Sequence, residues 1–394
     1  MKTVLFAWEL GGGMGHVTTL SRLARCLKRL DVRLVAAVKN PGAADSLAAL
    51  GVEIVQAPRW PSASMTQAQI AKSSSSTMGD VLSTAGLADK RGLSRLLGEW
   101  DDHFARIEPD LVVADLAPAA GLAARGRVPL MLVGNGYTLP PAAMPDFPPL
   151  HRISPPASAE WETLSVVNAA LQRRGQARLD RLPQVFSADA SLVLTFPLLD
   201  PYGPQRERPV DGPVFDEPPR AAGPDAGTIF FYLSRGYRLH RDMTGALLAL
   251  APKLRIHAPE LSDTQIRALR QAGAVVEAEP VPSANALASA RLIVHTGGSG
   301  LAAEALAAGV PQLVLSMQVE QDLNGSALQR AGLGRLIRAY DPTSRIDAST
   351  INELFQDNAL AARAGEAGRE HREWLDRADT LEKFASQARE LLRI

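Results

Sequence analysis

Short apolar runs alternate with segments of helical spacing over the first half of the chain. The apolar runs, which predict strands, cover residues 3–8, 32–38, 52–55, 109–115, 129–133 and 191–195. Apolar residues recur at helical spacing over residues 16–30, 42–50, 93–104 and 158–182. Strands that alternate with helices are typical of a parallel sheet covered by helices on both faces. Residues 58–84 break the pattern, and their low hydrophobicity predicts a long surface excursion.

The same pattern begins again at residue 228. Predicted strands follow at residues 228–233, 254–258, 274–278, 292–294 and 310–315, and the tail over 359–394 is helical and charge-rich. Residues 197–227 are rich in proline and have no periodicity, as expected of a linker. A chain of 394 residues also exceeds the usual size of a single core. The sequence therefore predicts an α/β protein with two Rossmann-like, doubly wound domains, one over 1–196 and one over 228–375.

The stretch 291–324 carries the strongest candidate chemistry. After a short apolar run come Gly297, Gly298, Ser299 and Gly300, and then an Ala-rich helical segment that ends at Gly309. Glycines let backbone amides approach a ligand closely, and the first amides of a helix are unpaired and partly positive, so this loop predicts a phosphate site. The plain alternative is an ordinary glycine turn between a strand and a helix.

Three carboxylate and amide side chains extend this candidate site. Glu304 lies about one turn into the predicted helix, where it could bind ribose hydroxyls. Glu320 and Gln321 follow the next predicted strand, where a polar ligand could lie across the strand ends.

This stretch resembles the nucleotide-sugar-binding signature of the UDP-glycosyltransferases and macrolide glycosyltransferases. The residues that fit the order of that signature are His295, Gly297, Gly298, Gly300, Glu304, Gly309, Val310, Pro311, Glu320 and Gln321. The sequence departs from it at Thr296, where many members have the diphosphate-binding His, and at Leu301, where Ser or Thr is usual. The Trp-x-Pro-Gln element that reads the nucleobase appears only as residues 280–283, which have no Trp or Gln.

The glycine loop at 11–15 leads into a second candidate, His16. The segment from Gly15 resembles the family's opening Gly-His-x-x-Pro pattern, with Thr19 in place of the proline, and the resemblance implies that His16 is the general base. An imidazole at a helix N-terminus is disfavoured in its charged form and so can take up a proton. The alternative is a capping or merely polar loop His.

Asp115 ends the predicted strand 109–115 and would be the partner of His16 in the resemblance. A carboxylate bonded to one imidazole nitrogen fixes the tautomer and stabilises the imidazolium. The alternative is a helix N-cap Asp. Both residues are expected at the carboxyl ends of strands in one sheet, where ligands bind in this fold class.

Further binding residues are predicted from the loops that follow other strands. Asn135, Tyr137 and Phe147 could line a pocket for an acceptor. Ser234 and Arg235 occupy a loop that in the family lies next to the donor phosphates. The guanidinium of Arg235 suits phosphate oxygens, although a solvated surface Arg is an equal alternative.

The amino-acid composition limits the classes of binding partner and of metal site that we expect. The 42 basic and 42 acidic residues cancel, so no global charge favours nucleic acid or an acidic membrane, and we expect neither as a partner. The single cysteine, Cys26, excludes an intrachain disulfide and a Cys-rich metal site, which fits a cytoplasmic protein. The apolar run at the start is too short to span a bilayer and reads as a buried strand.

The resemblance implies the GT-B architecture, in which two Rossmann-like domains face each other across a cleft and a C-terminal helix, here 376–394, packs back on the acceptor-binding N-terminal domain. It also implies an inverting glycosyltransferase that needs no metal or cofactor and moves a sugar from a nucleoside diphosphate donor, expected to be a UDP-sugar, to a small hydroxylated acceptor. Two alternatives remain open: a sugar-nucleotide epimerase or hydrolase of the same fold, and a non-catalytic nucleotide-sugar-binding protein.

Overall fold

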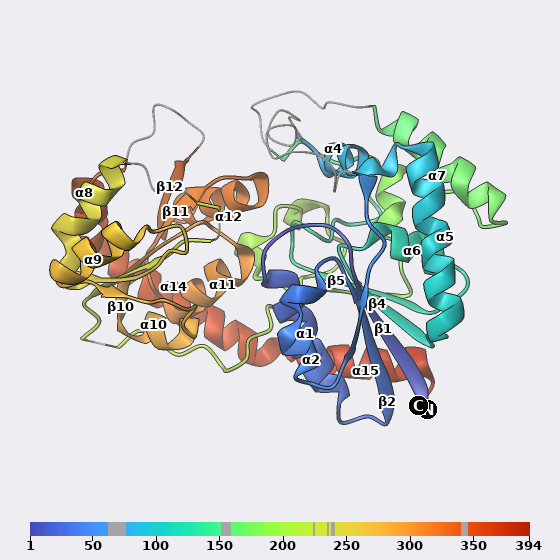
Figure 1. Cartoon of the computed structure of the whole chain (residues 1–394), viewed down its shortest axis with the longest axis horizontal. Helices are drawn as coiled ribbons and strands as arrows, with labels where there is room; N and C mark the ends of the chain where they lie inside the picture. The colour runs from blue at the N-terminus through green and yellow to red at the C-terminus, as the bar shows by residue number, and fades with distance from the viewer. Residues whose placement is uncertain (62–75, 151–158, 224, 235, 238–240, 340–345) are drawn as a thin grey trace. The chain divides into compact units, whose positions relative to one another are not determined.

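The computed structural model describes residues 1–61, 76–150, 159–223, 225–234, 236–237, 241–339 and 346–394 of the chain. These residues form two compact units (Figure 1). The first unit comprises Met1–Leu194, Asp200–Val214 and Asp379–Ile394, and the second comprises Thr195–Leu199 and Phe215–Ala378. Residues 200–214 of the predicted linker therefore pack with the first unit, and the chain returns to that unit at Asp379.

The first unit is built on a six-stranded parallel sheet with the order β3-β2-β1-β4-β5-β6 among its described residues. Its strands are β1 (Lys2–Trp8), β2 (Val32–Val38), β3 (Glu53–Gln56), β4 (Leu111–Asp115), β5 (Leu130–Gly134) and β6 (Ala190–Val193). Its helices are α1 (Gly15–Leu27), α2 (Asp45–Ala48), α4 (Met78–Leu82), α5 (Lys90–Ile107), α6 (Pro118–Ala124), α7 (Glu160–Arg173) and α15 (Thr380–Leu392). In this sheet Trp8 of β1 lies opposite Asp115 of β4.

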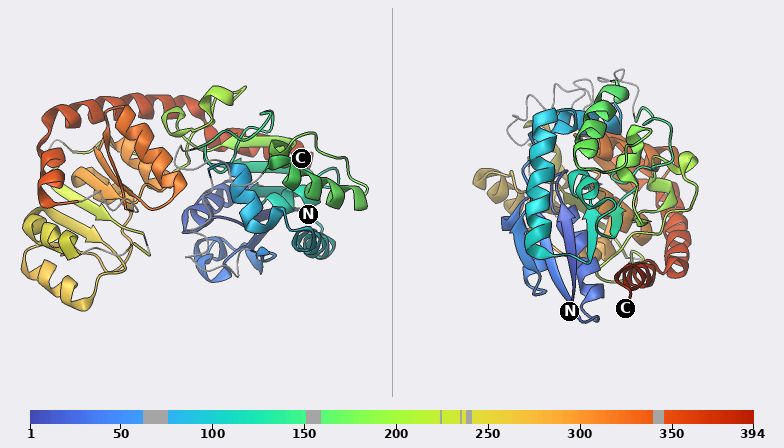
Figure 2. Two further views of the ribbon diagram at one scale, coloured as in Figure 1. Left: turned by 90° about the horizontal axis from the view of Figure 1, so that it is seen from above. Right: turned by 90° about the vertical axis from the view of Figure 1, so that its right-hand side faces the viewer.

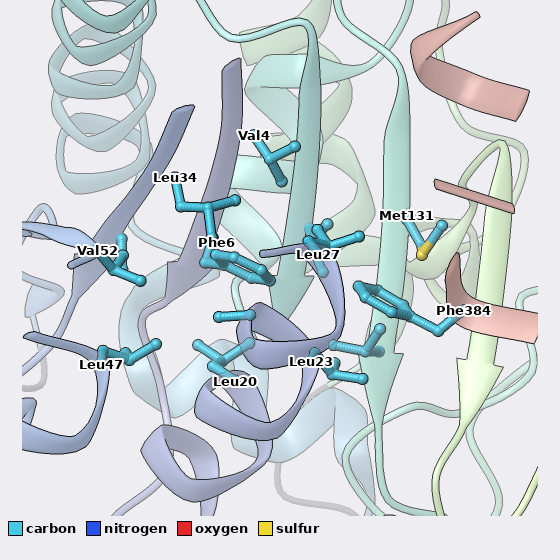
Figure 3. Close-up of a cluster of buried hydrophobic side chains, with 14 of the residues drawn as sticks. Val4, Phe6, Leu20, Leu23, Leu27, Leu34, Leu47, Val52, Met131 and Phe384 are labelled. Carbon is cyan, nitrogen blue, oxygen red and sulfur yellow. The ribbon is translucent and has the colours of Figure 1, made fainter. Parts of the chain in front are cut away.

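The apolar side chains of β1 and β4 fill one face of this sheet together with α1, α2 and α15 (Figure 3). Phe6, Leu20 and Leu23 are fully buried there, and Phe384 of α15 lies in the same cluster. Burying an aliphatic or aromatic side chain of this size is worth about 1.5–3 kcal/mol, so Phe384 ties the C-terminal helix to the first unit. Helix α5 runs alongside the strands of this unit (Figure 2) and packs against α6 and α7.

The second unit repeats the architecture with the order β12-β11-β10-β7-β8-β9 among its described residues. Its strands are β7 (Thr228–Tyr232), β8 (Leu254–His257), β9 (Val275–Val276), β10 (Ala290–His295), β11 (Gln312–Ser316) and β12 (Gly334–Arg338). Its helices are α8 (Arg241–Leu250), α9 (Asp263–Gln271), α10 (Ser283–Ser289), α11 (Ser299–Ala308), α12 (Val319–Arg330), α13 (Ala348–Gln356) and α14 (Asn358–Ala378). The predicted α/β class with two doubly wound sheets is confirmed.

Several predicted elements are shorter than expected. The helix predicted over 158–182 ends at Arg173, because the chain turns at Gly175 with a positive φ of 67°. The tail is two helices, since Asp379 adopts a left-handed φ of 49° between α14 and α15. The helix predicted over 42–50 is only a 3-10 turn followed by the four residues of α2.

The surface excursion predicted over 58–84 is wrong for its last part. Thr77 and Asp80 form a capping box that starts α4, and Met78 and Leu82 of this helix are fully buried. Residues 62–75 of this stretch lie outside the described residues.

Candidate active site

The strand orders place one ligand-binding edge in each unit. In both sheets the chain winds outward from a central strand, returns to that strand's other side and winds outward again, so the order reverses between β1 and β4 and between β7 and β10. Ligands of doubly wound sheets bind outside the carboxyl ends of the strands at this reversal. His16 follows β1 and Asp115 ends β4, whereas Ser234 follows β7 and Thr296 follows β10.

His16 and Asp115 meet at the reversal of the first sheet. The Nδ1 atom of His16 lies 3.0 Å from Oδ2 of Asp115, and both side chains are largely buried. His16 occupies the first turn of α1, where Val17, Leu20 and Leu23 fix the helix against the sheet. The carboxylate accepts a hydrogen bond from Nδ1–H, which leaves Nε2 as the basic nitrogen of the neutral ring.

Two residues of the first strand and its loop fix the imidazole from other sides. The ring of Trp8 stacks on that of His16, with centroids 5.3 Å apart and an interplanar angle of 21°. Gly11 has a φ of +81°, and a Cβ at this position would lie 2.3 Å from His16 Nε2. Only glycine combines this backbone conformation with room beside Nε2. In the sequence Trp8 is only the last residue of an apolar run, and the spacing of the glycines alone did not identify Gly11.

Asp115 is buried at the end of β4 with an uneven set of partners. Its Oδ2 pairs with His16, whereas Oδ1 is buried without a hydrogen-bond partner among the described residues. The next residue, Leu116, has a left-handed φ of 43° although it carries a side chain. Such strain persists only where the surrounding structure holds it, and it is common near functional sites.

The loop after β10 has the open glycine backbone expected of an anion site. Gly297 has a φ of +87°, and a Cβ there would clash with Val314 and with the backbone of Gln321. Gly298 begins α11 as its N-cap without a side-chain hydrogen bond, and the space around Gly298 and Gly300 is open. The first amides of the ten-residue helix α11 are therefore available to an anion.

Thr296 and Ser234 supply hydroxyl groups at the same edge. Their Oγ atoms are 3.0 Å apart, which joins the carboxyl ends of β10 and β7. Arg235, the predicted phosphate-binding cation, lies outside the described residues.

His295 is placed differently from a ligand-binding side chain. The ring is 1% exposed, its Nε2 lies 3.0 Å from Gln312 Oε1, and its Nδ1 accepts from the amide of Gly297. Burial lowers the pKa of His295 to about 4, so the ring is neutral. Because both nitrogens are used inside the unit, His295 holds the glycine loop, and this arrangement contradicts the expected direct contact with the donor.

Polar side chains of α12 brace the glycine loop. Asn324 donates to the carbonyl of Gly297 and to Ser299 Oγ, and Ser299 Oγ donates to Glu320 over 2.6 Å. Gln321 is buried, and its Oε1 accepts from the amide of Met317. The structure thus brings the predicted residues Ser299 and Glu320 together, with Gln321 next in the chain, and adds Asn324, which was not predicted from the sequence.

Glu304 and Ser283 lie together at the other side of α11. Ser283, the first residue of α10, donates a hydrogen bond to Glu304 Oε2. Glu304 is partly exposed on this side of the helix. Ser283 stands in the segment where the family has its base-reading element, so the structure brings that segment to the predicted ribose site.

The three predicted acceptor residues separate into two groups. Asn135 and Tyr137 are partly exposed in the loop after β5, where Asn135 Oδ1 accepts from the amide of Thr138. Phe147 is buried and packs edge-on against Phe186 with centroids 6.1 Å apart. The role of Phe147 as a pocket-lining residue is therefore wrong in this structure, because its ring belongs to the core.

Two other features bear on the chemistry. Within the described residues, no group of three or more His, Cys, Asp or Glu side chains is arranged to hold a metal ion. In the same part of the chain, no helix has the length and apolar character of a membrane span.

Comparison with known proteins relates this geometry to a family. Residues 246–372 match the erythromycin biosynthesis protein CIII-like C-terminal domain. The calicheamicin glycosyltransferase CalG4 has a similar structure, with a TM-score of 0.70 and 20% identity over 99% of this chain and 98% of that one. The second unit is therefore similar in sequence to this C-terminal domain over residues 246–372, and the chain has the fold of GT-B glycosyltransferases such as CalG4. The predicted resemblance and the GT-B fold are confirmed.

Curated relatives of this family match over part of their length. Elloramycin glycosyltransferase ElmGT of Streptomyces olivaceus is 37% identical over 23% of this chain and 22% of its own length. A PGL/p-HBAD biosynthesis rhamnosyltransferase of Mycobacterium bovis is 27% identical over 63% of this chain and 61% of its own length. The chain thus aligns with about a fifth of the first relative and less than two thirds of the second.

Proposed function

We propose that this protein transfers a sugar from a nucleoside diphosphate donor to a hydroxylated small molecule, with His16 as the general base. The observation that carries the proposal is the contact between His16 Nδ1 and Asp115 Oδ2 at the reversal of the first sheet. The glycine loop and the first amides of α11 support a donor diphosphate at the equivalent edge of the second sheet. Homologues and structural neighbours are named glycosyltransferases, which supports the reaction class.

In this mechanism Nε2 of His16 takes the proton of the acceptor hydroxyl while its oxygen attacks the anomeric carbon. The bond from that carbon to the diphosphate oxygen breaks, and the configuration inverts in a single displacement. Asp115 stabilises the imidazolium that forms and keeps the proton on Nδ1. The amides of Ser299 and Gly300 and the hydroxyls of Thr296 and Ser234 would stabilise the charge on the leaving diphosphate without a metal ion.

The remaining donor residues are assigned by their position. Glu304, next to Ser283, would bind the ribose, and Glu320 and Gln321 would bind the transferred sugar. Two solved neighbours bear on the nucleobase: the glycosyltransferase VinC is in complex with DTDP, and the spinosyn rhamnosyltransferase SpnG is in complex with thymidine diphosphate. We therefore propose a UDP-sugar or a thymidine diphosphate sugar as the donor. Asn135 and Tyr137 remain the candidates for acceptor contact.

Product analysis tests this function. The protein is incubated with UDP- and thymidine diphosphate sugars, with and without a panel of phenolic and alcoholic acceptors, and products are identified by mass spectrometry. Transfer predicts a new glycoside and a free nucleoside diphosphate that depend on the acceptor. Free sugar or an epimerised donor without acceptor would favour the hydrolase or epimerase, and nucleotide binding with no product would favour the binding protein.

A further inference from the structure

Glu9 is a buried carboxylate directly beyond the end of β1. It is 2% exposed, and it follows Trp8, whose ring stacks on His16. Whereas Trp8 belongs to the cluster around α1, the side chain of Glu9 contacts α5 and α6. The proposed mechanism does not use Glu9, and a carboxylate is rarely buried to this extent without a specific set of partners.

Within the described residues, the Glu9 carboxylate accepts every hydrogen bond that it makes, and each donor is an N–H group. Trp100 Nε1 donates to Oε1 over 2.5 Å, and the amide of Ala119 donates to Oε2 over 2.8 Å, with that of Ala120 at 3.5 Å. The indole N–H of Trp60 is buried nearby without a hydrogen bond of good geometry. Three donors and no acceptor favour the ionised carboxylate as the form that fits.

Glu9 therefore holds the first turn of α6 from outside the helix. Ala117, the N-cap of α6, makes no side-chain capping bond, so Glu9 supplies the acceptor that this turn needs. Leu10 adds a second link, because its amide donates to the carbonyl of Leu116 over 3.1 Å. Residues 9 and 10 thus tie down both sides of the turn that directly follows Asp115.

That turn contains the strained backbone of Leu116, with its φ of 43°. A non-glycine residue rarely adopts this conformation and needs fixed surroundings to keep it. The links from Glu9 and Leu10 are the ones that fix it from β1. Asp115 directly precedes this turn, and its Oδ2 contacts Nδ1 of His16.

We propose that Glu9 is a positioning residue for the His16–Asp115 pair, and that it acts by holding the first turn of α6 against the end of β1. Its effect on turnover rests on the proposed function of His16, but its effect on the imidazole does not. The two can fail separately, because the state of the His16 ring is observable without any substrate.

The charge state of Glu9 sets the condition for the test. Burial raises the pKa of Glu9 to about 7, against the opposing effect of its hydrogen-bond donors. The titratable groups nearest to these partners are His103 on α5, whose ring lies 5.4 Å from that of Trp100, and the His16–Asp115 pair beside Trp8. Measurements at about pH 8 therefore have Glu9 largely ionised.

The test is the tautomer of His16 in protein labelled with ¹⁵N in its histidine rings. The His16 signals are assigned by their loss in His16→Gln. In the wild type at pH 8 we expect the neutral ring with its proton on Nδ1. Glu9→Gln places an amide donor against the donors of Trp100 or Ala119, so we expect a mixture of the two tautomers and a turnover lower by about 10–100-fold.

Two further variants keep the result interpretable. Glu160→Gln is the matched control, because Glu160 also accepts a backbone amide, that of Phe147, and burial likewise raises its pKa to about 7. It should leave the His16 tautomer as in the wild type. Glu9→Asp retains the charge on a shorter side chain and replaces Glu9→Gln in the test if that variant does not fold. We expect Glu9→Asp also to shift His16 toward a mixture of the two tautomers. A His16 ring that stays on the Nδ1 tautomer in a folded Glu9 variant would overturn the proposal.

Discussion

His16 Nδ1 lies 3.0 Å from Asp115 Oδ2, although His16 follows β1 and Asp115 ends β4, so the fold alone brings the two residues together. The second unit has a matching relationship, since Ser234 and Thr296 bring their hydroxyls to 3.0 Å at the corresponding reversal of its sheet. Each sheet thus joins the loops after its two central strands by one side-chain pair. The first pair joins an imidazole to a carboxylate, and the second joins two hydroxyls beside the N-terminus of α11.

Gly11 is expected to be essential for the position of His16. Gly11→Ala introduces a Cβ that would lie 2.3 Å from Nε2, at a backbone φ of +81° that side chains rarely adopt. We expect turnover to fall by about 10²-fold or more because the imidazole is displaced. The matched variant is Gly12→Ala, where a Cβ meets no atom within 4 Å, and it should stay close to the wild type. Equal turnover of both variants would show that the imidazole does not depend on this contact.

Glu304 is expected to contribute to nucleotide binding. Glu304→Ala should weaken the binding of UDP or thymidine diphosphate, measured by calorimetry, by about 1–3 kcal/mol, the scale of a charged hydrogen bond. Ser283→Ala removes only the donor to Glu304 Oε2 and should cause a smaller loss. If the nucleotide bound a folded Glu304→Ala protein with unchanged affinity, Glu304 would not contact the ribose.

The position of a candidate site residue was predictable from the sequence where that residue lies at or just after the end of a predicted strand. His16, Asp115 and Thr296 are adjacent to apolar runs, and the rule that parallel strands end at one edge brings them to the ligand side. His295 was misplaced because every residue of the last half of β10 is buried, so the alternation that tells inward from outward side chains is absent. The prediction that Phe147 lines a pocket was wrong for a related reason, since an apolar residue after a strand can pack in a core as well as line a pocket.

Helix α12 and the role of Glu9 could not be predicted from the sequence pattern. Helix α12 was not predicted because its buried face has one large apolar side chain, Leu328, while its other buried residues are polar or small: Gln321, Asp322, Asn324, Gly325 and Ala327. The role of Glu9 depends on Trp100 and on the amides of α6, which are distant in the chain. Such contacts become visible only when the fold is known.

The crossing of α11 and α14 predicts opposite effects for two glycines of one helix. A Cβ at Gly368 would lie 2.5 Å from the Cα of Gly309, so Gly368→Ala should lower the free energy of unfolding by about 1–3 kcal/mol. A Cβ at Gly365 meets no atom within 4 Å, and Gly365→Ala should raise that free energy by up to about 1 kcal/mol because alanine favours helix. Urea denaturation measures both. A loss for Gly365→Ala as large as for Gly368→Ala would contradict this packing.

Glu160 makes stability depend on pH. Burial, and then Asp146 and Asp80, raise the pKa of Glu160 from 4.5 to about 7, while the amide of Phe147 opposes the rise. Because the folded-state pKa is raised, its stabilising contribution is complete below about pH 4.5 and is lost as the pH rises through about 7. Glu160→Gln should therefore raise the melting temperature relative to the wild type at pH 8 and have little effect at pH 4.5.

The exposed residue Glu366 on α14 provides the control for this measurement. Glu366→Gln makes the same chemical change at the surface and should shift the melting temperature at pH 8 less than Glu160→Gln does. If Glu160→Gln shifted the melting temperature equally at both pH values, the ionisation of Glu160 would not lower the stability of the folded protein.

The most direct test of the proposed chemistry is the turnover of His16→Gln, measured with saturating donor and acceptor beside calorimetric binding of the nucleoside diphosphate. Glutamine retains a polar side chain of similar reach but cannot act as the base, and the donor site belongs to the other unit. We predict that turnover falls by about 10²–10⁴-fold, the usual worth of positioned proton transfer, with nucleotide affinity unchanged. Near-normal turnover in the folded variant would contradict the assignment of His16 as the base.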